Sequence, residues 1–238
     1  MKGRKLRYSF IILQLVLYIS FLFLDIQGGN YVLSNYIKFT VVALCLLYVF
    51  IYGYKNFDSQ LLFLRLALIF TLISDIQLLL LDNYNYFYGV LTFILAQEFH
   101  GIRISILDNS KVRYIKDFTV RLLYQSLTGL AICLLLWVAN VQINGLLAAS
   151  VFYFICMLTN TVRSLKLTVR NKERKDIRLL AIGMVLFLLC DINVGLFNLS
   201  AFLPVGPVYD KIYALSSILM WTFYAPSQVF ISLSRDNM

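Results

Sequence analysis

Residues 59–82 read SQLLFLRLALIFTLISDIQLLLLD, and this stretch decides what kind of fold the chain adopts. Of its 24 residues only Arg65, Asp75 and Asp82 are charged. A helix that crosses the hydrocarbon core of a bilayer needs roughly 17–25 mostly apolar residues. The stretch therefore predicts a transmembrane helix that carries one carboxyl group, that of Asp75, well inside the apolar run.

The rest of the chain repeats this pattern. Seven further windows have the length and apolar character of a span: 8–25, 36–54, 85–107, 118–139, 144–167, 177–199 and 211–234. The whole sequence is 61% hydrophobic and only 14% charged, whereas a soluble domain carries about 25% charged residues. We therefore predict an all-α integral membrane bundle of about eight transmembrane helices, with residues 1–238 forming a single transmembrane domain.

The positive charge of the chain orients this bundle. Of the 21 Lys and Arg residues, all but Lys38 and Lys211 lie at the N-terminus, in the tail, or at alternate connections between the windows. Cytoplasmic connections are enriched in Lys and Arg, so both termini are expected on the cytoplasmic side. The net charge of +9 is accounted for in this way, and no nucleic-acid-binding motif accompanies it. The pattern fits a plasma membrane, best the cytoplasmic membrane of a bacterium.

The sequence also contains a weak internal repeat. A window with an Asp after a small residue is followed in each half of the chain by a window with a central Gln. The corresponding pairs are Ser74-Asp75 with Cys190-Asp191, and Ala96-Gln97 with Ser227-Gln228. The windows 59–82 and 177–199 run in the same direction across the membrane. We therefore predict a parallel repeat of four helices plus four, related by an axis along the membrane normal.

Asp75 and Asp191 are the candidate catalytic residues. Asp75 lies seven residues before the outer end of its window and Asp191 eight before the end of its own, which places both roughly 10–12 Å below the outer surface at about 1.5 Å per residue. Two carboxyl groups at one depth can meet across a cavity, where one keeps its proton and the other is an anion. The alternative is that each Asp only bonds neighbouring polar groups and holds helices together.

Window 85–107 adds further polar residues to the membrane interior. Glu98 lies nearest the midplane, and His100 and Arg103 lie towards the cytoplasm. Glu98 and Arg103 can form a structural ion pair, whereas Gln97 and Arg103 can reach into the bundle. The sequence does not contain two His with a carboxylate at metal-ligand spacing, so no metal site and no cofactor are predicted.

Lys38 lies near the outer end of window 36–54, where two roles are open. Its side chain can extend to the membrane surface, as long cationic side chains do, or it can balance the charge of the Asp pair.

These residues together resemble the YhhN-like, or lysoplasmalogenase, family of multi-pass membrane proteins. The residues that carry the resemblance are Lys38, Ser74-Asp75, Gly89, Phe93, Ala96-Gln97, Cys190-Asp191, Tyr224 and Gln228. The chain departs from the family pattern at Gln97, where a histidine is usual, and at Cys190, where a serine is usual.

The resemblance implies hydrolysis of the vinyl ether bond of lysoplasmalogens, with a membrane lipid or lysolipid as the partner. In that interpretation Asp75 and Asp191 are catalytic, in an order left open, and Lys38 holds the phosphate or tunes the pair. The remaining substrate-binding candidates are Ser74, Gln97, Tyr224 and Gln228. A small transporter or lipid-binding sensor that uses the same buried acids is the competing interpretation, and the oligomeric state is left open.

Overall fold

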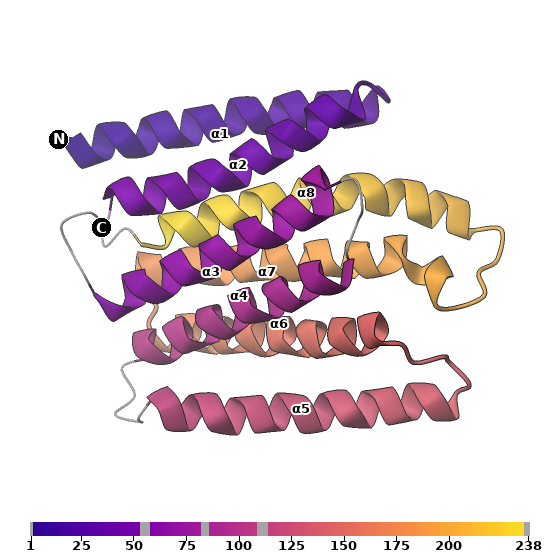
Figure 1. Cartoon of the computed structure of the whole chain (residues 1–238). Helices are drawn as coiled ribbons and strands as arrows, with labels where there is room; N and C mark the ends of the chain where they lie inside the picture. Colours follow the sequence, from indigo (N-terminus) through magenta and orange to yellow (C-terminus); the bar gives the residue numbers. More distant parts are fainter. Residues whose placement is uncertain (1, 53–57, 82–85, 109–113, 236–238) are drawn as a thin grey trace.

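The computed structural model describes residues 2–52, 58–81, 86–108 and 114–235. Eight α-helices run up and down through this part of the chain (Figure 1). They are α1 (Lys2–Ile26), α2 (Tyr31–Tyr52), α3 (Ser59–Asp75), α4 (Tyr86–Leu107), α5 (Tyr114–Val138), α6 (Gly145–Arg170), α7 (Lys175–Phe197) and α8 (Tyr209–Leu233). A π-helix, η1 (Ile76–Leu80), continues α3, and a short 3-10 helix, η2 (Leu199–Ala201), follows α7. The described residues hold no strand, so the predicted all-α membrane bundle is confirmed.

Seven of the eight helices, α1 to α7, are long and apolar enough to cross a membrane. Helix α8, with 25 residues, is as long as the other helices, but its sequence is more polar. Asp210 and Lys211 at its start are exposed, but four other polar residues that lower its hydropathy are buried: Ser216, Ser227, Gln228 and Ser232. Because these side chains face other helices and not lipid, the polar face of α8 belongs to the interior of the bundle.

The helices pack as a closed ring with two outer additions. The ring runs α2, α3, α4, α6, α7, α8 and back to α2, since each neighbouring pair is in contact. Helix α1 lies outside against α2 and α8, and α5 lies outside against α4 and α6. In Figure 1 these two helices form the upper and lower edges of the molecule.

This arrangement is a four-plus-four repeat. The helices α1, α2, α3 and α4 correspond to α5, α6, α7 and α8 in that order. Each helix contact named above then has a counterpart in the other half; the contact of α2 with α3, for example, corresponds to that of α6 with α7. The contacts of α3 with α4 and of α7 with α8 are the most extensive in their halves. The two halves therefore have the same pattern of helix contacts.

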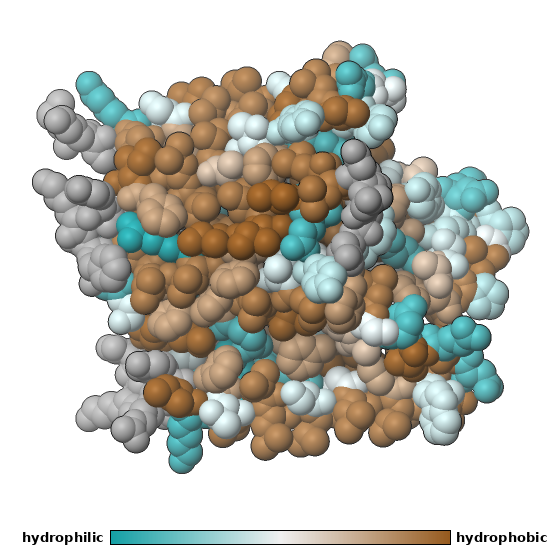
Figure 2. Space-filling model, in the orientation of Figure 1, coloured by the Kyte–Doolittle hydropathy of each residue, from teal (hydrophilic) through white to brown (hydrophobic). Residues whose placement is uncertain are grey.

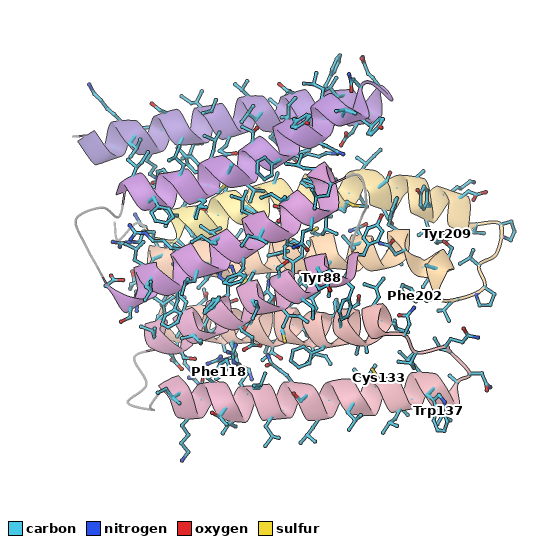
Figure 3. All side chains as sticks on the ribbon, viewed as in Figure 1. Tyr88, Phe118, Cys133, Trp137, Phe202 and Tyr209 are labelled. Atoms are coloured by element: carbon cyan, nitrogen blue, oxygen red, sulfur yellow. The ribbon has the colours of Figure 1, made fainter. Side chains whose placement is uncertain are left out.

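The surface is suited to lipid. Figure 2 shows apolar residues over the middle of the visible face. The outer helices carry many of the exposed apolar side chains, among them Ile12 and Ile19 on α1 and Leu127 and Leu135 on α5. Trp137, 68% exposed, projects away from the bundle at the end of α5 (Figure 3).

The start of α1 and the end of α8 lie at the same end of the bundle (Figure 1). This end also holds the end of α6 and the start of α7, with the cations Arg170, Arg174 and Lys175. The structure thus gathers cations at one end, as the orientation rule requires. Lys55, Lys111 and Arg113, which the prediction also used, lie outside the described residues.

Candidate functional site

Asp75 lies where α3 changes into the π-helix η1. Short π-helical segments occur often at functional sites. The carboxyl group is 3% exposed, and the hydroxyl of Tyr224 on α8 donates to it, with oxygen–oxygen distances of 3.0 and 2.9 Å. The neighbouring Ser74 hydroxyl donates to the backbone oxygen of Gly89 on α4 at 2.7 Å. Ser74 therefore fixes α3 against α4.

Gly89 leaves room for Leu78 at this contact. A Cβ atom at residue 89 would lie 2.8 Å from the side chain of Leu78 in η1. The glycine of the family-like pattern thus lets α4 approach the π-helical turn beside Asp75.

Asp191 occupies the corresponding position in the second half. Asp75 is the last of the 17 residues of α3, and Asp191 is the seventeenth residue of α7. The carboxylate of Asp191 accepts a hydrogen bond of 2.9 Å from the hydroxyl of Tyr153 on α6. Unlike Asp75, Asp191 is partly exposed. The two acids thus lie at one register in unequal surroundings.

An aromatic cluster lies between the two Asp–Tyr pairs. The ring of Phe93 is 5.7 Å from that of Tyr153 and 6.4 Å from that of Tyr224, centroid to centroid. Phe187 contacts both Phe93, at 6.0 Å, and Tyr224, at 5.4 Å. The described residues show no hydrogen bond between the carboxyl groups of Asp75 and Asp191. These carboxyl groups therefore flank an aromatic wall and do not touch each other directly.

Lys38 takes neither of the two expected roles. Its ammonium group is buried and lies 2.9 Å from the carboxylate of Asp25 on α1, which also accepts a 2.6 Å hydrogen bond from Ser34. The same ammonium group lies 4.9 Å from the ring centroid of Trp221, and Trp221 packs on Tyr224 at 5.2 Å. Lys38 is thus linked to the Asp75 side of the cluster through two aromatic rings.

Gln97 and Gln228 lie one helical turn from the aromatic cluster. Gln97 follows Phe93 by four residues and Gln228 follows Tyr224 by four, so each pair shares a helix face. Both glutamines are fully buried. Asn160 donates to the side-chain and backbone oxygens of Gln97, at 3.2 and 2.7 Å, and Gln228 donates to Ser227 at 3.3 Å. The glutamines extend the cluster towards the cation-rich end.

The polar residues of α4 have other partners than the sequence indicated. Glu98 forms an ion pair of 2.7 Å with Arg121 of α5, and not with Arg103. Arg103 instead donates to Ser234, at the end of α8, at 2.9 Å. His100 is fully buried, and neither ring nitrogen has a partner among the described residues.

Several of these partners had no signal in the sequence. Arg121 was counted only as an orienting cation, Asp25 only as the end of a window, and Tyr153 is one of 16 tyrosines. A tyrosine or asparagine in an apolar helix becomes a candidate only when the packing shows what it touches.

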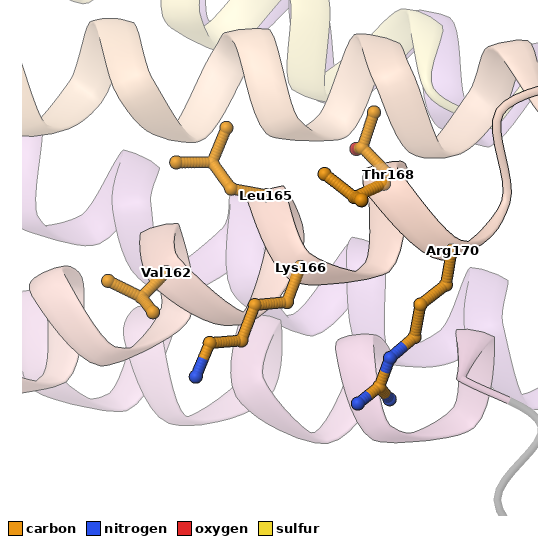
Figure 4. A pocket seen from close by; sticks show the side chains of 6 residues that line it. Val162, Leu165, Lys166, Thr168 and Arg170 are labelled. Carbon is orange, nitrogen blue, oxygen red and sulfur yellow. The ribbon is translucent and has the colours of Figure 1, made fainter.

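A surface hollow of about 600 Å³ lies on α6 away from the site. Its lining residues are Val162, Leu165, Lys166, Thr168, Val169 and Arg170. Lys166 and Arg170 project from the same side of α6 (Figure 4). Val162 lies nine residues along α6 from Tyr153, about 13 Å at 1.5 Å per residue. The hollow is therefore separate from the acids. Within the described residues, no three His, Cys, Asp or Glu side chains gather as metal ligands would.

The model of the YhhN family matches residues 33–235. No curated protein and no solved structure matches the chain. The matched range contains both acids, both tyrosines and both central glutamines.

Proposed function

Because this chain belongs to the YhhN family, we propose that it is a membrane-embedded hydrolase that cleaves the vinyl ether bond of lysoplasmalogen-type lipids. One observation carries the proposal: two carboxyl groups at one register, each bonded by a tyrosine hydroxyl, flank an aromatic cluster inside an apolar bundle. A purely structural Asp needs a partner but does not need a second acid at the same depth. The membrane in which it acts is proposed to be a plasma membrane, as the cation pattern indicates.

The two acids suit the two halves of the reaction. A carboxylic acid gives its proton to the alkenyl carbon, which leaves an oxocarbenium-like centre. A carboxylate then takes a proton from water as the water oxygen adds to that centre. The resulting hemiacetal breaks its bond to the glycerol oxygen, which receives the second proton while the hydroxyl proton returns to the first carboxylate. The products are a fatty aldehyde and a glycerophospho head group, and both acids regain their starting forms.

Exposure assigns the order of the acids in this proposal. Asp75 is enclosed by protein and bonded by Tyr224, so it is the proton donor. Asp191 is partly exposed, so it is the carboxylate that water reaches. The faces of the aromatic rings favour a positive centre between the two acids. Lys38, held by Asp25, binds the phosphate.

The remaining substrate contacts are assigned by position. Tyr224 and Gln228 lie on one face of α8, and Gln97 lies on the related face of α4. We propose that the alkenyl chain of the lipid packs on the aromatic cluster between these helices. Ser74 positions α3 through Gly89 and thereby sets the place of Asp75.

The test is mass spectrometry of the purified protein incubated with a lysoplasmalogen and with an ester-linked lysolipid. We expect aldehyde release from the first lipid, and a loss of roughly 10²–10⁴-fold in Asp75→Asn and in Asp191→Asn. Asp210→Asn, which removes an exposed acid at the start of α8, is the matched control and keeps the wild-type rate. Wild-type turnover in both site variants would refute the proposal.

The four-plus-four arrangement favours a second candidate function, transport. Parallel repeats related by an axis along the membrane normal are found in transporters, with the substrate site between the halves. The aromatic cluster joins α4 and α8, one from each half. Lipid that stays intact in the assay, together with proton-dependent uptake of a lysolipid into vesicles, would establish transport in place of hydrolysis.

A further inference from the structure

A layer of buried polar side chains lies between α4, α5 and α6, apart from the aromatic cluster. Arg121 of α5 lies at its centre, with Glu98 of α4 at 2.7 Å and Asn160 of α6 at 3.1 Å. Asn160 in turn donates to Gln97. These four residues are at most 7% exposed. The layer is therefore a continuous hydrogen-bonded network inside the membrane-spanning part of the bundle.

The network is continued towards the cation-rich end of the bundle. Arg163 of α6 donates to Asp117 of α5 at 2.8 Å and to Ser105 of α4 at 2.9 Å. The Arg163 and Asp117 side chains are 24% and 32% exposed. Arg163 also donates to the backbone oxygen of Gly101, three residues after Glu98. Polar groups thus line the three-helix corner from its surface to its buried centre.

Two further side chains on the Asn160 face of α6 lie between this network and Asp191. Cys156 lies one turn from Asn160 on α6 and is fully buried. Tyr153 lies one further turn along the same face and donates to Asp191. A ladder of polar side chains on α6 therefore connects the corner to the partly exposed acid of the site.

Many polar atoms along this layer lack a protein partner. Within the described residues these atoms are Gln97 Nε2, Glu98 Oε1, Arg121 Nε and both terminal side-chain atoms of Gln125. Gln125 is fully buried and lies one turn from Arg121. Buried polar groups are rarely left unbonded, and ordered water is the usual partner when protein is not. The five unpartnered atoms of this layer are therefore places where ordered water can bind.

We propose that this α4–α5–α6 layer is a water path from the cation-rich end of the bundle to Asp191. The proposal rests on the proposed hydrolysis for its purpose, because each turnover consumes one water molecule inside an apolar bundle. Gln125 and Asn160 are positioning residues that hold this water, and neither touches the lipid.

The corner that corresponds to it in the repeat supplies a matched control. It is formed by α1, α2 and α8, and it contains Gln14 and Cys45. There Gln14 Nε2 donates to the backbone oxygen of Val41 at 3.0 Å and to the sulfur of Cys45 at 3.5 Å, while Gln14 Oε1 has no partner among the described residues. Cys45 and Cys156 are both fully buried. Of these two cysteines, only Cys156 lies on the proposed path.

The first experiment is hydroxyl-radical footprinting, in which X-rays generate radicals from water next to protein side chains and mass spectrometry locates the oxidation. We expect Cys156 to be oxidised at least tenfold faster than Cys45, although the static exposure of both is zero. Gln125→Leu, which removes the polar group at similar size, should lower the Cys156 rate at least fivefold. Gln14→Leu should leave that rate unchanged. Equal rates for the two thiols in the unmodified protein would overturn the proposal without any variant.

Turnover separates this inference from the proposed function. If the protein is a hydrolase and the path supplies its water, Gln125→Leu lowers kcat roughly tenfold and leaves KM unchanged. Rapid Cys156 oxidation without lipid cleavage would uphold the water path and refute hydrolysis, and the path would then serve proton-coupled transport. Lipid cleavage with slow Cys156 oxidation would refute the path and leave hydrolysis in place.

Discussion

Tyr224 and Phe93 occupy related positions, and the difference between them explains why the two acids are bonded unequally. Each is followed four residues later by a buried glutamine, on the related helices α8 and α4. Tyr224 donates its hydroxyl to Asp75, whereas Phe93 has no hydroxyl to give to Asp191. Tyr153, from α6, supplies the missing donor. At this position the two halves thus share the arrangement of helices and differ in the side chain that holds the acid.

This substitution leads to a rescue experiment. Tyr153→Phe should lower lipid turnover about 10–100-fold, because Asp191 loses the hydroxyl that orients it. Adding Phe93→Tyr should restore most of that rate, since the new hydroxyl would take the place on Asp191 that Tyr224 takes on Asp75. Phe187→Tyr in the same background is the control, because Phe187 belongs to the cluster without being the related residue. Equal effects of the two additions would contradict the assignment.

Among the helices, the α4–α5–α6 corner depends on one glycine. A Cβ atom at Gly101 would overlap the guanidinium group of Arg121. The absence of a side chain on α4 therefore lets the guanidinium of α5 pass across that helix and reach Glu98 and Asn160. An arginine buried in an apolar bundle needs such partners, because an unpaired buried charge is strongly destabilising.

Gly101→Ala should accordingly separate Arg121 from Glu98. Breaking a buried ion pair costs about 3–5 kcal/mol, which corresponds to a melting temperature lower by roughly 10 °C for a chain of this size. Thermal unfolding in detergent measures the change. Gly195→Ala on α7 is the matched control, since nothing lies within 4 Å of the added Cβ there, and it should leave the melting temperature almost unchanged. A similar melting temperature for both variants would show that Arg121 has another stable arrangement.

For the whole molecule, hydropathy predicted the fold well because the bilayer constrains it so strongly. The eight windows correspond to eight helices, and the Asp and Gln pairs were enough to predict the four-plus-four repeat. The pairing of side chains between helices could not be predicted in the same way. A helix that is apolar on all sides gives no indication of which face meets which neighbour. Lys38 with Asp25, Glu98 with Arg121 and Asp191 with Tyr153 therefore emerged only from the packing.

The ring itself provides a test that needs no assumption about function. The end of α8 and the start of α1 lie at the same end of the bundle, and the two helices are in contact. A circular permutant can therefore begin at residue 114, end at residue 108, and join residues 235 and 2 through a short flexible Gly/Ser linker. In this permutant α5 to α8 come before α1 to α4 in the sequence, while every helix contact of the repeat is kept.

We expect this permutant to insert and fold with a melting temperature close to that of the parent, because its new termini remain at the cation-rich end. The control is a permutant with the same linker that is cut between residues 139 and 144, where α5 meets α6. That cut separates α5 from the other helices of its half and places the termini at the opposite end, against the orientation rule. Its yield in the membrane should be much lower. Equal yield and stability for the two permutants would mean that neither the four-helix halves nor the charge pattern govern assembly, and that contacts around the ring suffice from any starting point.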